Sequence, residues 1–352
     1  FRVEYDDNYN ETELDEQDSV KFIEQVDLIY NLNLDQTFLS LRYEPSFIYW
    51  TDRDDDTDLH HAFDGILNHA FSPRVSLSVK DTFRLAEQPE YIDRESVARE
   101  NNDYIYNTAS AALSYLLSEQ TRLEAAGRMV NLAYDEDAVA DTQDYDIYVA
   151  GLTLRHSLMP ETALLGELRY EDLQYSDDLR DSDTYYIGGG VEHSFSSSLL
   201  GSARAGLQAR SFDSTVRDSN DTPYVDLSGT FLPTPATRIS SGFSFSQYET
   251  DVAPFASQER TRFFVSLAHD ITARISGYLT GAYTNGDYDK DETPSGEVVD
   301  GSEDRVQFSA RATYKVNMDN HVELGYQYTD LSSDVRGDYS RNRVNLGWVL
   351  KL

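Results

Sequence analysis

The sequence contains no cysteine, and this absence excludes disulfide bonds, thiolate catalysis and cysteine-ligated metal sites. It also has no run of about 18 apolar residues, the length that a membrane-spanning helix needs, so we expect neither such a helix nor a retained signal peptide. The chain begins at Phe1, and we expect that a leader or an upstream segment has been removed. Amphipathic patterns of helical period are nearly absent too, which predicts few helices.

Positive charge is scarce. The chain has 29 Lys and Arg against 63 Asp and Glu, for a net charge of −34 and a pI near 4.3. Because phosphate binding needs clustered basic side chains, nucleic acid is not an expected partner. Mean hydropathy is −0.56, yet aromatic residues make up 12% of the chain and include 25 Tyr. Acidic disordered chains are poor in aromatics, so we expect a folded protein.

What the sequence has in abundance is alternation with a period of two. The segment "RVQFSARATYKVN" (305–317) is typical, because apolar side chains take every second position and Arg311 and Lys315 lie between them. Successive side chains of a strand point to opposite faces, so this strand has one apolar and one polar, basic face. The apolar positions are Val306, Phe308, Ala310, Ala312, Tyr314 and Val316. The same alternation occurs in 20–34, 74–85, 321–328 and 343–352.

The connections between these segments fall into two classes that alternate along the chain. The tight ones lie at 35–36, 72–74, 118–120, 159–161, 196–198, 233–236, 271–273 and 317–320. The long, acidic ones lie at 11–19, 52–58, 87–103, 135–144, 176–184, 213–222, 249–258, 287–304 and 332–338. Segments between these breaks number about 18, and both chain ends fall on the rim with the tight turns.

An even number of antiparallel strands, with tight turns on one rim and long loops on the other, is typical of bacterial outer-membrane barrels. The predicted fold class is therefore all-β: a transmembrane antiparallel up-and-down β-barrel of about 18 strands, with short periplasmic turns and long acidic extracellular loops. Residues 1–352 form its single domain. The predicted location is the bacterial outer membrane, with membrane lipid and lipopolysaccharide as partners. A soluble all-β protein such as a propeller is the alternative, but no blade repeat is visible.

Tyrosines cluster beside the long connections, where a belt at the membrane interface is expected. They are Tyr5, Tyr9, Tyr49, Tyr104, Tyr106, Tyr134, Tyr170, Tyr175, Tyr248, Tyr283 and Tyr328. The alternative is that Tyr is simply a good strand residue.

The face opposite the apolar one carries the charge that would line a lumen. Its basic residues are Arg2, Lys21, Arg42, Lys80, Arg84, Arg122, Arg128, Arg155, Arg169, Arg204, Arg210, Arg238, Arg262, Arg274, Arg311, Lys315, Arg343 and Lys351. Its acidic residues are Glu4, Asp27, Glu44, Asp64, Glu124, Glu167, Glu171, Glu192, Asp226, Asp270 and Glu323. This face is mildly basic, so most of the acidic residues fall in the long loops.

Rings of Lys and Arg favour anions in a channel. We therefore take one group of inward cations as candidates for selectivity: Arg42, Lys80, Arg84, Arg128, Arg155, Arg169, Arg204, Arg262, Arg274 and Arg311. The alternative is that Arg and Glu pair across neighbouring strands and fill the barrel with a lattice of ion pairs.

Signatures of enzymes and cofactors are weak. "DYDKDE" (287–292) begins like a calcium loop, but Glu292 stands where the motif needs Gly and Val298 where it needs Glu. No cofactor is expected, although loose Ca²⁺ binding by the acidic loops is an alternative. His60 and His61 are adjacent, so at most one of them could join a site on one face. Gly188–Gly190 is followed by no Lys-Ser/Thr, and no G-x-S-x-G motif occurs. We expect no enzyme.

The chain resembles the putative β-barrel porin 2 family in its opening "FRVEYDDNYN", its alternating strands with Asp-rich loops, and its last strand "NRVNLGWVLKL". One departure is that barrels of this kind usually end on an aromatic residue, whereas here the end is Leu352 and Trp348 lies four residues earlier. Some family members are associated with exopolysaccharide secretion. The resemblance thus implies a passive conduit for export of an anionic polysaccharide, with periplasmic export machinery as a partner.

Two other functions stay open. One is a diffusion porin for small anionic solutes, and the other is a plugged barrel that anchors a larger outer-membrane assembly. Loops 87–103 and 287–304 are expected outside the cell, and either is long enough to fold into the lumen. The oligomeric state is left open by the sequence.

Overall fold

The computed structural model describes residues 1–52, 57–87, 102–176, 180–214, 219–250, 255, 257–292 and 298–351. Its strands, in chain order, are β1 (Arg2–Asp6), β2 (Ser19–Gln25), β3 (Leu28–Asn33), β4 (Thr37–Trp50), β5 (Thr57–Ser72), β6 (Val75–Ala86), β7 (Tyr104–Leu116), β8 (Thr121–Tyr134), β9 (Tyr145–Met159), β10 (Thr162–Tyr175), β11 (Ser182–Ser196), β12 (Leu199–Phe212), β13 (Asn220–Thr234), β14 (Thr237–Glu249), β15 (Ser257–Asp270), β16 (Ile275–Glu292), β17 (Val298–Lys315), β18 (Asn320–Ser333) and β19 (Tyr339–Leu350). A short helix, α1 (Asp137–Gln143), lies between β8 and β9.

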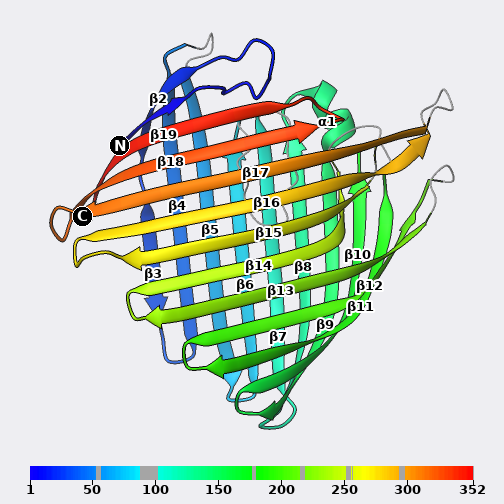
Figure 1. Ribbon diagram of the computed structural model, residues 1–352. Helices are drawn as coiled ribbons and strands as arrows, with labels where there is room; N and C mark the ends of the chain where they lie inside the picture. Colours follow the sequence, from blue (N-terminus) through cyan, green and yellow to red (C-terminus); the bar gives the residue numbers. More distant parts are fainter. Residues whose placement is uncertain are drawn as a thin grey trace.

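Neighbours in sequence pair as antiparallel neighbours in space, and the sheet closes because β1 pairs with both β2 and β19. In Figure 1 the strands of the near wall run across those of the far wall, as tilted strands of a closed barrel must. The two chain ends meet on one rim, where the Phe1 amino group donates to the Trp348 carbonyl at 3.0 Å. The predicted closed antiparallel barrel, with both ends on the tight-turn rim, is confirmed.

The prediction of about 18 strands holds with one refinement, because the segment 20–34 forms two strands instead of one. β2 pairs with β4 down to Gln25, and β3 resumes the pairing at Leu28. Pro45 of β4 lies opposite this gap and has no N–H to donate, so the ladder is interrupted there. The barrel therefore has 18 strand positions, one of them broken into two.

The apolar face points outward, as the alternation predicts. On β17, Val306, Phe308 and Tyr314 are exposed, while Glu303 and Arg305 on the other face are buried inside the barrel. Large apolar side chains that face water in a monomer normally mark an interaction surface. Such side chains project from most strands of the barrel, which fits a protein whose outer surface contacts lipid. Among the described residues, no helix has the length and apolarity to cross a membrane.

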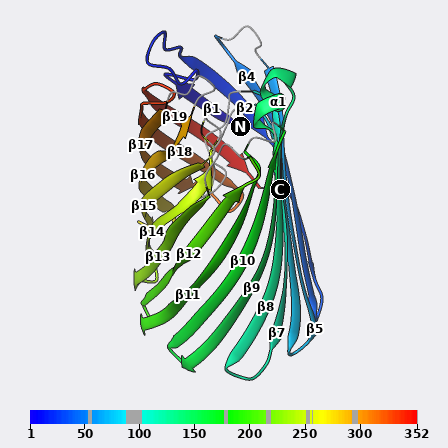
Figure 2. The same ribbon diagram turned by 90° about the vertical axis from the view of Figure 1, so that its right-hand side faces the viewer.

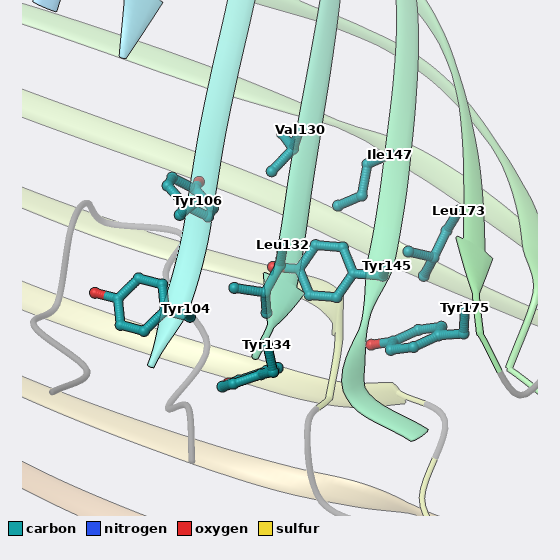
Figure 3. Close-up of a cluster of buried hydrophobic side chains, with 9 residues drawn as sticks. All are labelled: Tyr104, Tyr106, Val130, Leu132, Tyr134, Tyr145, Ile147, Leu173 and Tyr175. Atoms are coloured by element: carbon teal, nitrogen blue, oxygen red, sulfur yellow. The ribbon is translucent and has the colours of Figure 1, made fainter. Parts of the chain in front are cut away.

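Part of the tyrosine belt prediction is wrong. Tyr5, Tyr49 and Tyr283 are exposed on the outward face, but Tyr104, Tyr106, Tyr134 and Tyr175 point inward and are buried. They belong to a cluster of nine inward-facing side chains from β7, β8, β9 and β10, shown in Figure 3, against which Val139 and Ala140 of α1 pack. Figure 2 shows α1 beside the upper ends of these strands, on the rim of the long loops. These tyrosines occupy inward-facing positions of their strands, so their side chains lie in the lumen at the long-loop end.

At the long-loop rim, hydrogen bonds also connect strands that are not paired neighbours. β13 and β14 pair only from Val225 toward the tight turn, and the end of β14 beyond that point contacts other strands. The Tyr175 hydroxyl donates to the Thr250 carbonyl at 3.0 Å, and Gln208 of β12 donates to the Gln247 carbonyl at 3.3 Å. The loop connections 53–56, 88–101, 215–218 and 293–297 lie outside the described residues.

Candidate functional site: the lumen wall

The candidate site is the inward wall of the barrel. The ten cations proposed for selectivity lie on strands distributed around it, except for Arg274, which lies in the tight turn before β16. Their strands are β4 for Arg42, β6 for Lys80 and Arg84, β8 for Arg128, β9 for Arg155, β10 for Arg169, β12 for Arg204, β15 for Arg262 and β17 for Arg311. Seven of them occupy the face opposite the exposed apolar residues of the same strand, and the pairing of β6 with β5 places Lys80 and Arg84 on that face too.

One ion-pair network runs across β9 to β12. The Arg155 Nε atom lies 3.0 Å from a carboxylate oxygen of Glu192, and the Arg204 guanidinium lies 4.0 Å from the other. Arg204 also lies 3.7 Å from Glu167. These contacts join two cations and two carboxylates into a ladder, and each member is partly exposed. Arg155 and Arg204 are therefore largely compensated where they stand.

Tyr224 of β13 continues this network. Its hydroxyl donates to Glu167 at 2.6 Å. The ring lies so close to Gly188 and Gly206 that a Cβ at either position would clash with it, at 1.9 Å from the Tyr224 hydroxyl and 2.5 Å from the ring. The glycine run Gly188–Gly190 is thus strand structure in β11, and it provides the space that Tyr224 needs.

A second network surrounds the break between β2 and β3. Arg42 donates to Asp27 at 2.8 Å and also pairs with Glu44, while Asp64 lies 4.0 Å away. Arg84 donates to Asp64 at 2.8 Å. Here two guanidinium groups face three carboxylates. Arg42 and Arg84 therefore leave no positive excess for a passing solute.

The first network borders a luminal cavity of about 240 Å³, since Glu167 and Arg204 both line it. The Arg169 guanidinium stacks 3.6 Å above the Tyr186 ring, and the Tyr186 hydroxyl donates to Glu171 at 3.4 Å. Arg128 and Arg204 line the cavity as well. The carboxylates of Glu167, Glu171, Asp226 and Glu249 line it too, so the cavity has no positive excess. Its charged groups and aromatic face are of the kind that bind the hydroxyl groups and rings of small polar solutes.

Several inward cations lie outside the two networks. Among the described residues, Lys80 and Arg274 have no ion pair, and Arg311 has only the Tyr278 ring, 5.6 Å from its guanidinium carbon. Arg122, Arg238 and Lys315 join them within a few residues of tight turns, again with no ion pair in the described part of the chain. The inward carboxylates toward this end include Glu124, Asp270 and Glu323, and two of them bond to hydroxyl groups. The tight turns themselves carry Asp35, Glu119, Glu161 and Asp319.

Three inward arginines at the long-loop rim were not among the inward residues predicted from the sequence. Arg260, Arg305 and Arg341 are buried. Arg341 holds Asp6 through two bonds of 2.9 and 2.5 Å, and Arg305 donates to Glu303 at 2.6 Å. Counting by twos from an inward neighbour would have found two of them, since Arg341 lies two residues before Arg343 and Arg260 two before Arg262.

Titration at the long-loop rim involves Asp144, at the end of the α1 connection. Burial raises the pKa of its carboxyl above the ordinary value, and the carboxylates of Asp146 and Asp141 act in the same direction. The Tyr134 N–H donates to the Asp144 carboxylate at 2.8 Å and opposes the rise in pKa.

The minor sequence signals have simple places in the fold. His61 faces outward and shares a hydrogen bond of 2.8 Å with the Tyr43 hydroxyl, and His60 faces inward. The side chains of Asp289 and Asp291 from the calcium-like segment lie outside the described residues. Within the described part of the chain, no three His, Asp or Glu side chains gather to hold a metal ion. Calcium at the acidic loops stays a prediction.

Comparisons with known proteins agree with this architecture. Residues 3–352 match the family described as Putative beta-barrel porin 2. No curated protein matches the chain. Three solved structures share its fold: OpdO of Pseudomonas aeruginosa (13% identity, TM-score 0.51, 99% of this chain and 94% of that chain), OccAB2 of Acinetobacter baumannii (13%, 0.52, 99% and 95%), and OccK2 (OpdF) of P. aeruginosa in complex with glucuronate (11%, 0.52, 100% and 96%).

Proposed function

Because the chain belongs to the Putative beta-barrel porin 2 family, we propose that it is a passive, non-enzymatic channel of the bacterial outer membrane that conducts small anionic solutes. Small carboxylates, including sugar acids, are the proposed solutes. The fold it shares with OccK2, solved in complex with glucuronate, makes this solute class a natural first choice. Residue roles are proposed from this chain alone, since identities of this size carry only the fold.

The observation that supports anion conduction is the set of inward cations without ion pairs. Lys80, Arg274 and Arg311 project from the wall with no carboxylate partner among the described residues. A barrel of about 16–18 strands is wide enough to hold water, and unpaired cations on a low-dielectric wall concentrate anions along it. The luminal cavity beside the Tyr186 ring, lined by both arginines and carboxylates, would then be a stopping place for a polar solute of monosaccharide size.

The test is the reversal potential of the purified barrel in a planar bilayer under a salt gradient. We expect anion selectivity in the native protein. Replacing Lys80, Arg274 and Arg311 together by Ser should shift the reversal potential toward cations. The matched control replaces Arg155 and Glu192 together by Ser, which removes an ion pair at constant net charge and should leave the potential nearly unchanged.

Three outcomes would contradict this proposal or part of it. An unchanged reversal potential in the triple variant would remove the role of the unpaired cations. A purified barrel that conducts no ions would instead favour the plugged, anchoring function. With a conducting barrel, glucuronate should enter liposomes faster than uncharged glucose, and equal rates would remove the preference for sugar acids.

A second candidate, export of an anionic polysaccharide, is favoured by the charge asymmetry between the rims. The acidic long loops would repel anions from the outer mouth, whereas the tight-turn end carries the unpaired cations. For that function a periplasmic export apparatus would be the partner. Cells lacking the protein should lose surface polysaccharide, and a variant with the three cations replaced should fail to restore it. Normal surface polysaccharide in the deletion strain would exclude this candidate.

A further inference from the structure

Four hydrogen bonds between Thr and His repeat at the tight-turn rim. Thr37 bonds to His69, Thr121 to His156, Thr162 to His193 and Thr237 to His269, with Oγ1 to Nδ1 distances between 2.8 and 2.9 Å. In every pair the Thr is the first residue of its strand, directly after a tight turn. The His lies directly opposite on the next strand. Four copies of one arrangement in equivalent positions indicate a shared role.

Each pair lies where the chain itself makes no connection. β4 and β5 are joined by a long loop at the far rim, so at the tight-turn rim Thr37 and His69 belong to different hairpins. The same holds for β8 with β9, β10 with β11, and β14 with β15. The hydrogen bonds therefore tie neighbouring tight hairpins together at this rim.

All four imidazoles face outward, in continuity with the lipid-facing wall. His156 alternates with Leu154 and Leu158, and His193 with Phe195, all of which are exposed. Exposed Phe71 and Ile271 follow His69 and His269 at the same spacing. The rings of Phe71 and Phe195 meet their neighbouring imidazoles edge to face at 4.5 and 4.6 Å. Each His is thus a polar side chain close to the rim, and apolar side chains flank it on the outward face.

The same rim level carries aromatic rings where it carries no His. The residues opposite the strand starts on other long-loop hairpins are Tyr115, Phe231 and Tyr314, and Trp348 bonds to Asn320 at 3.0 Å. Rings at this level are expected in the belt where acyl chains give way to headgroups. The imidazoles therefore lie at headgroup depth.

Binding of Nδ1 by Thr leaves the other ring nitrogen available. None of the four imidazoles has a further hydrogen bond within the described part of the chain, so Nε2 has no protein partner there. When the Thr hydroxyl donates to Nδ1, the ring proton resides on Nε2, which then donates. A donor that projects from an apolar wall at headgroup depth needs an acceptor from the membrane, and the phosphodiester oxygens are the strong acceptors at that depth.

We propose that His69, His156, His193 and His269 form a ring that donates hydrogen bonds from Nε2 to phospholipid headgroup phosphates of the leaflet at the tight-turn rim. The Thr partners act as positioning residues, because they fix the ring orientation and engage Nδ1. This inference does not depend on what passes through the lumen.

Solid-state NMR tests the contact directly, through phosphorus–nitrogen dipolar recoupling on the full-length barrel with isotope-labelled His. In vesicles of phosphatidylethanolamine and phosphatidylglycerol, we expect recoupling at Nε2 and much less at Nδ1. Replacing the four His by Gln should abolish the signal, while replacing His60, His61 and His321 by Gln should leave it intact. Replacing the four Thr by Val should leave phosphorus contact but remove the difference between the two nitrogens.

Three results would overturn the proposal. One is no recoupling in the native barrel, and another is recoupling that survives the replacement of all four His. The third is equal recoupling in a phosphate-free maltoside detergent supplied with inorganic phosphate, which would assign the contact to free phosphate instead of a headgroup. Far-UV circular dichroism and heat-modifiable electrophoretic mobility confirm that each variant folds, so a loss of signal reports the contact itself.

Discussion

The two ends of the barrel use the same inward-facing residue type differently. At the long-loop end, Arg341, Arg210 and Arg305 are buried and held by carboxylates. At the tight-turn end, Arg238 and Arg274 have no ion pair among the described residues. A buried guanidinium needs a carboxylate partner because its desolvation is costly. An exposed guanidinium can instead interact with ions and solutes in the solvent. An inward arginine is thus structural at one end and available to a solute at the other.

The largest difference between the ends should appear on removing a buried cation. Arg341→Ala leaves Asp6, which is fully buried, with Lys21 at 3.0 Å as its remaining ion-pair partner in the described part of the chain. Loss of one partner of a buried ion pair costs about 3–5 kcal/mol, and we expect a decrease of that size in the free energy of unfolding in urea. The matched variant Arg274→Ala at the open end should change it by less than about 0.5 kcal/mol. Similar costs for both variants would remove the distinction between the ends.

The comparison depends on correct assignment of the two faces, which a mid-strand pair can test. Ala310 faces outward between Leu279 and Tyr326, and Arg311 faces inward. Ala310→Arg should cost about 2–4 kcal/mol, the scale for a cation at the bilayer midplane. Arg311→Ala should cost much less. A reversed order would mean that the register is wrong by one residue, which exchanges the faces.

A smaller effect is expected where the long-loop end is bridged. Tyr175→Phe removes the hydroxyl that donates to the Thr250 carbonyl, and loss of one neutral hydrogen bond should cost about 1 kcal/mol. Because this bond ties β10 to the end of β14, single-channel recordings should also show noisier open currents. Tyr43→Phe, at a hydroxyl that faces outward, is the control. Identical noise in both variants would mean that the bridge does not influence the conducting path.

The smallest effect on stability is expected for the open-end cations Arg122, Arg238 and Lys315. Replaced singly by Ser, each should change the free energy of unfolding by less than about 0.5 kcal/mol. Replaced together, they should shift the reversal potential toward cations, since they lie near the inner mouth. A stability loss well above that limit would show that they have structural partners.

Much of the fold could be predicted because its signals are local. A period of two and the placement of tight and long connections depend only on neighbouring residues, so the strand pattern, the closed sheet and the outward positions of Val306 and Phe308 all followed. The break at Val26–Asp27 did not, because its cause is Pro45 on the neighbouring strand. Tyr104 and Tyr175 were misplaced because Tyr suits an interface, a strand and a buried wall equally well.

From the sequence, only the inward face that forms the candidate site could be predicted, and not the contacts within it. Alternation placed Arg155 and Arg204 inward, but which carboxylate each contacts depends on the stagger between strands and on side-chain rotamers. Nothing in the local sequence distinguishes Arg42, which forms ion pairs, from Lys80, which forms none among the described residues. The Thr–His pairs have one, since each Thr follows a tight turn directly and each His precedes the next turn by a few residues. That repetition becomes meaningful only once the strands are paired.

The seam between β1 and β19 bears on how the barrel assembles. The other pairs join strands that are neighbours in the chain, apart from β2 with β4 around the short β3, whereas the bond from Phe1 to Trp348 spans 347 positions. Hairpins with short loops form quickly and at small entropic cost, and contacts between distant residues form late. The same seam holds Arg341 with Asp6 and Asn342 with Asp7. We therefore expect the pairing of these two edges to be a late step of folding, and the buried ion pair and hydrogen bonds at the seam hold together a sheet that would otherwise reopen there.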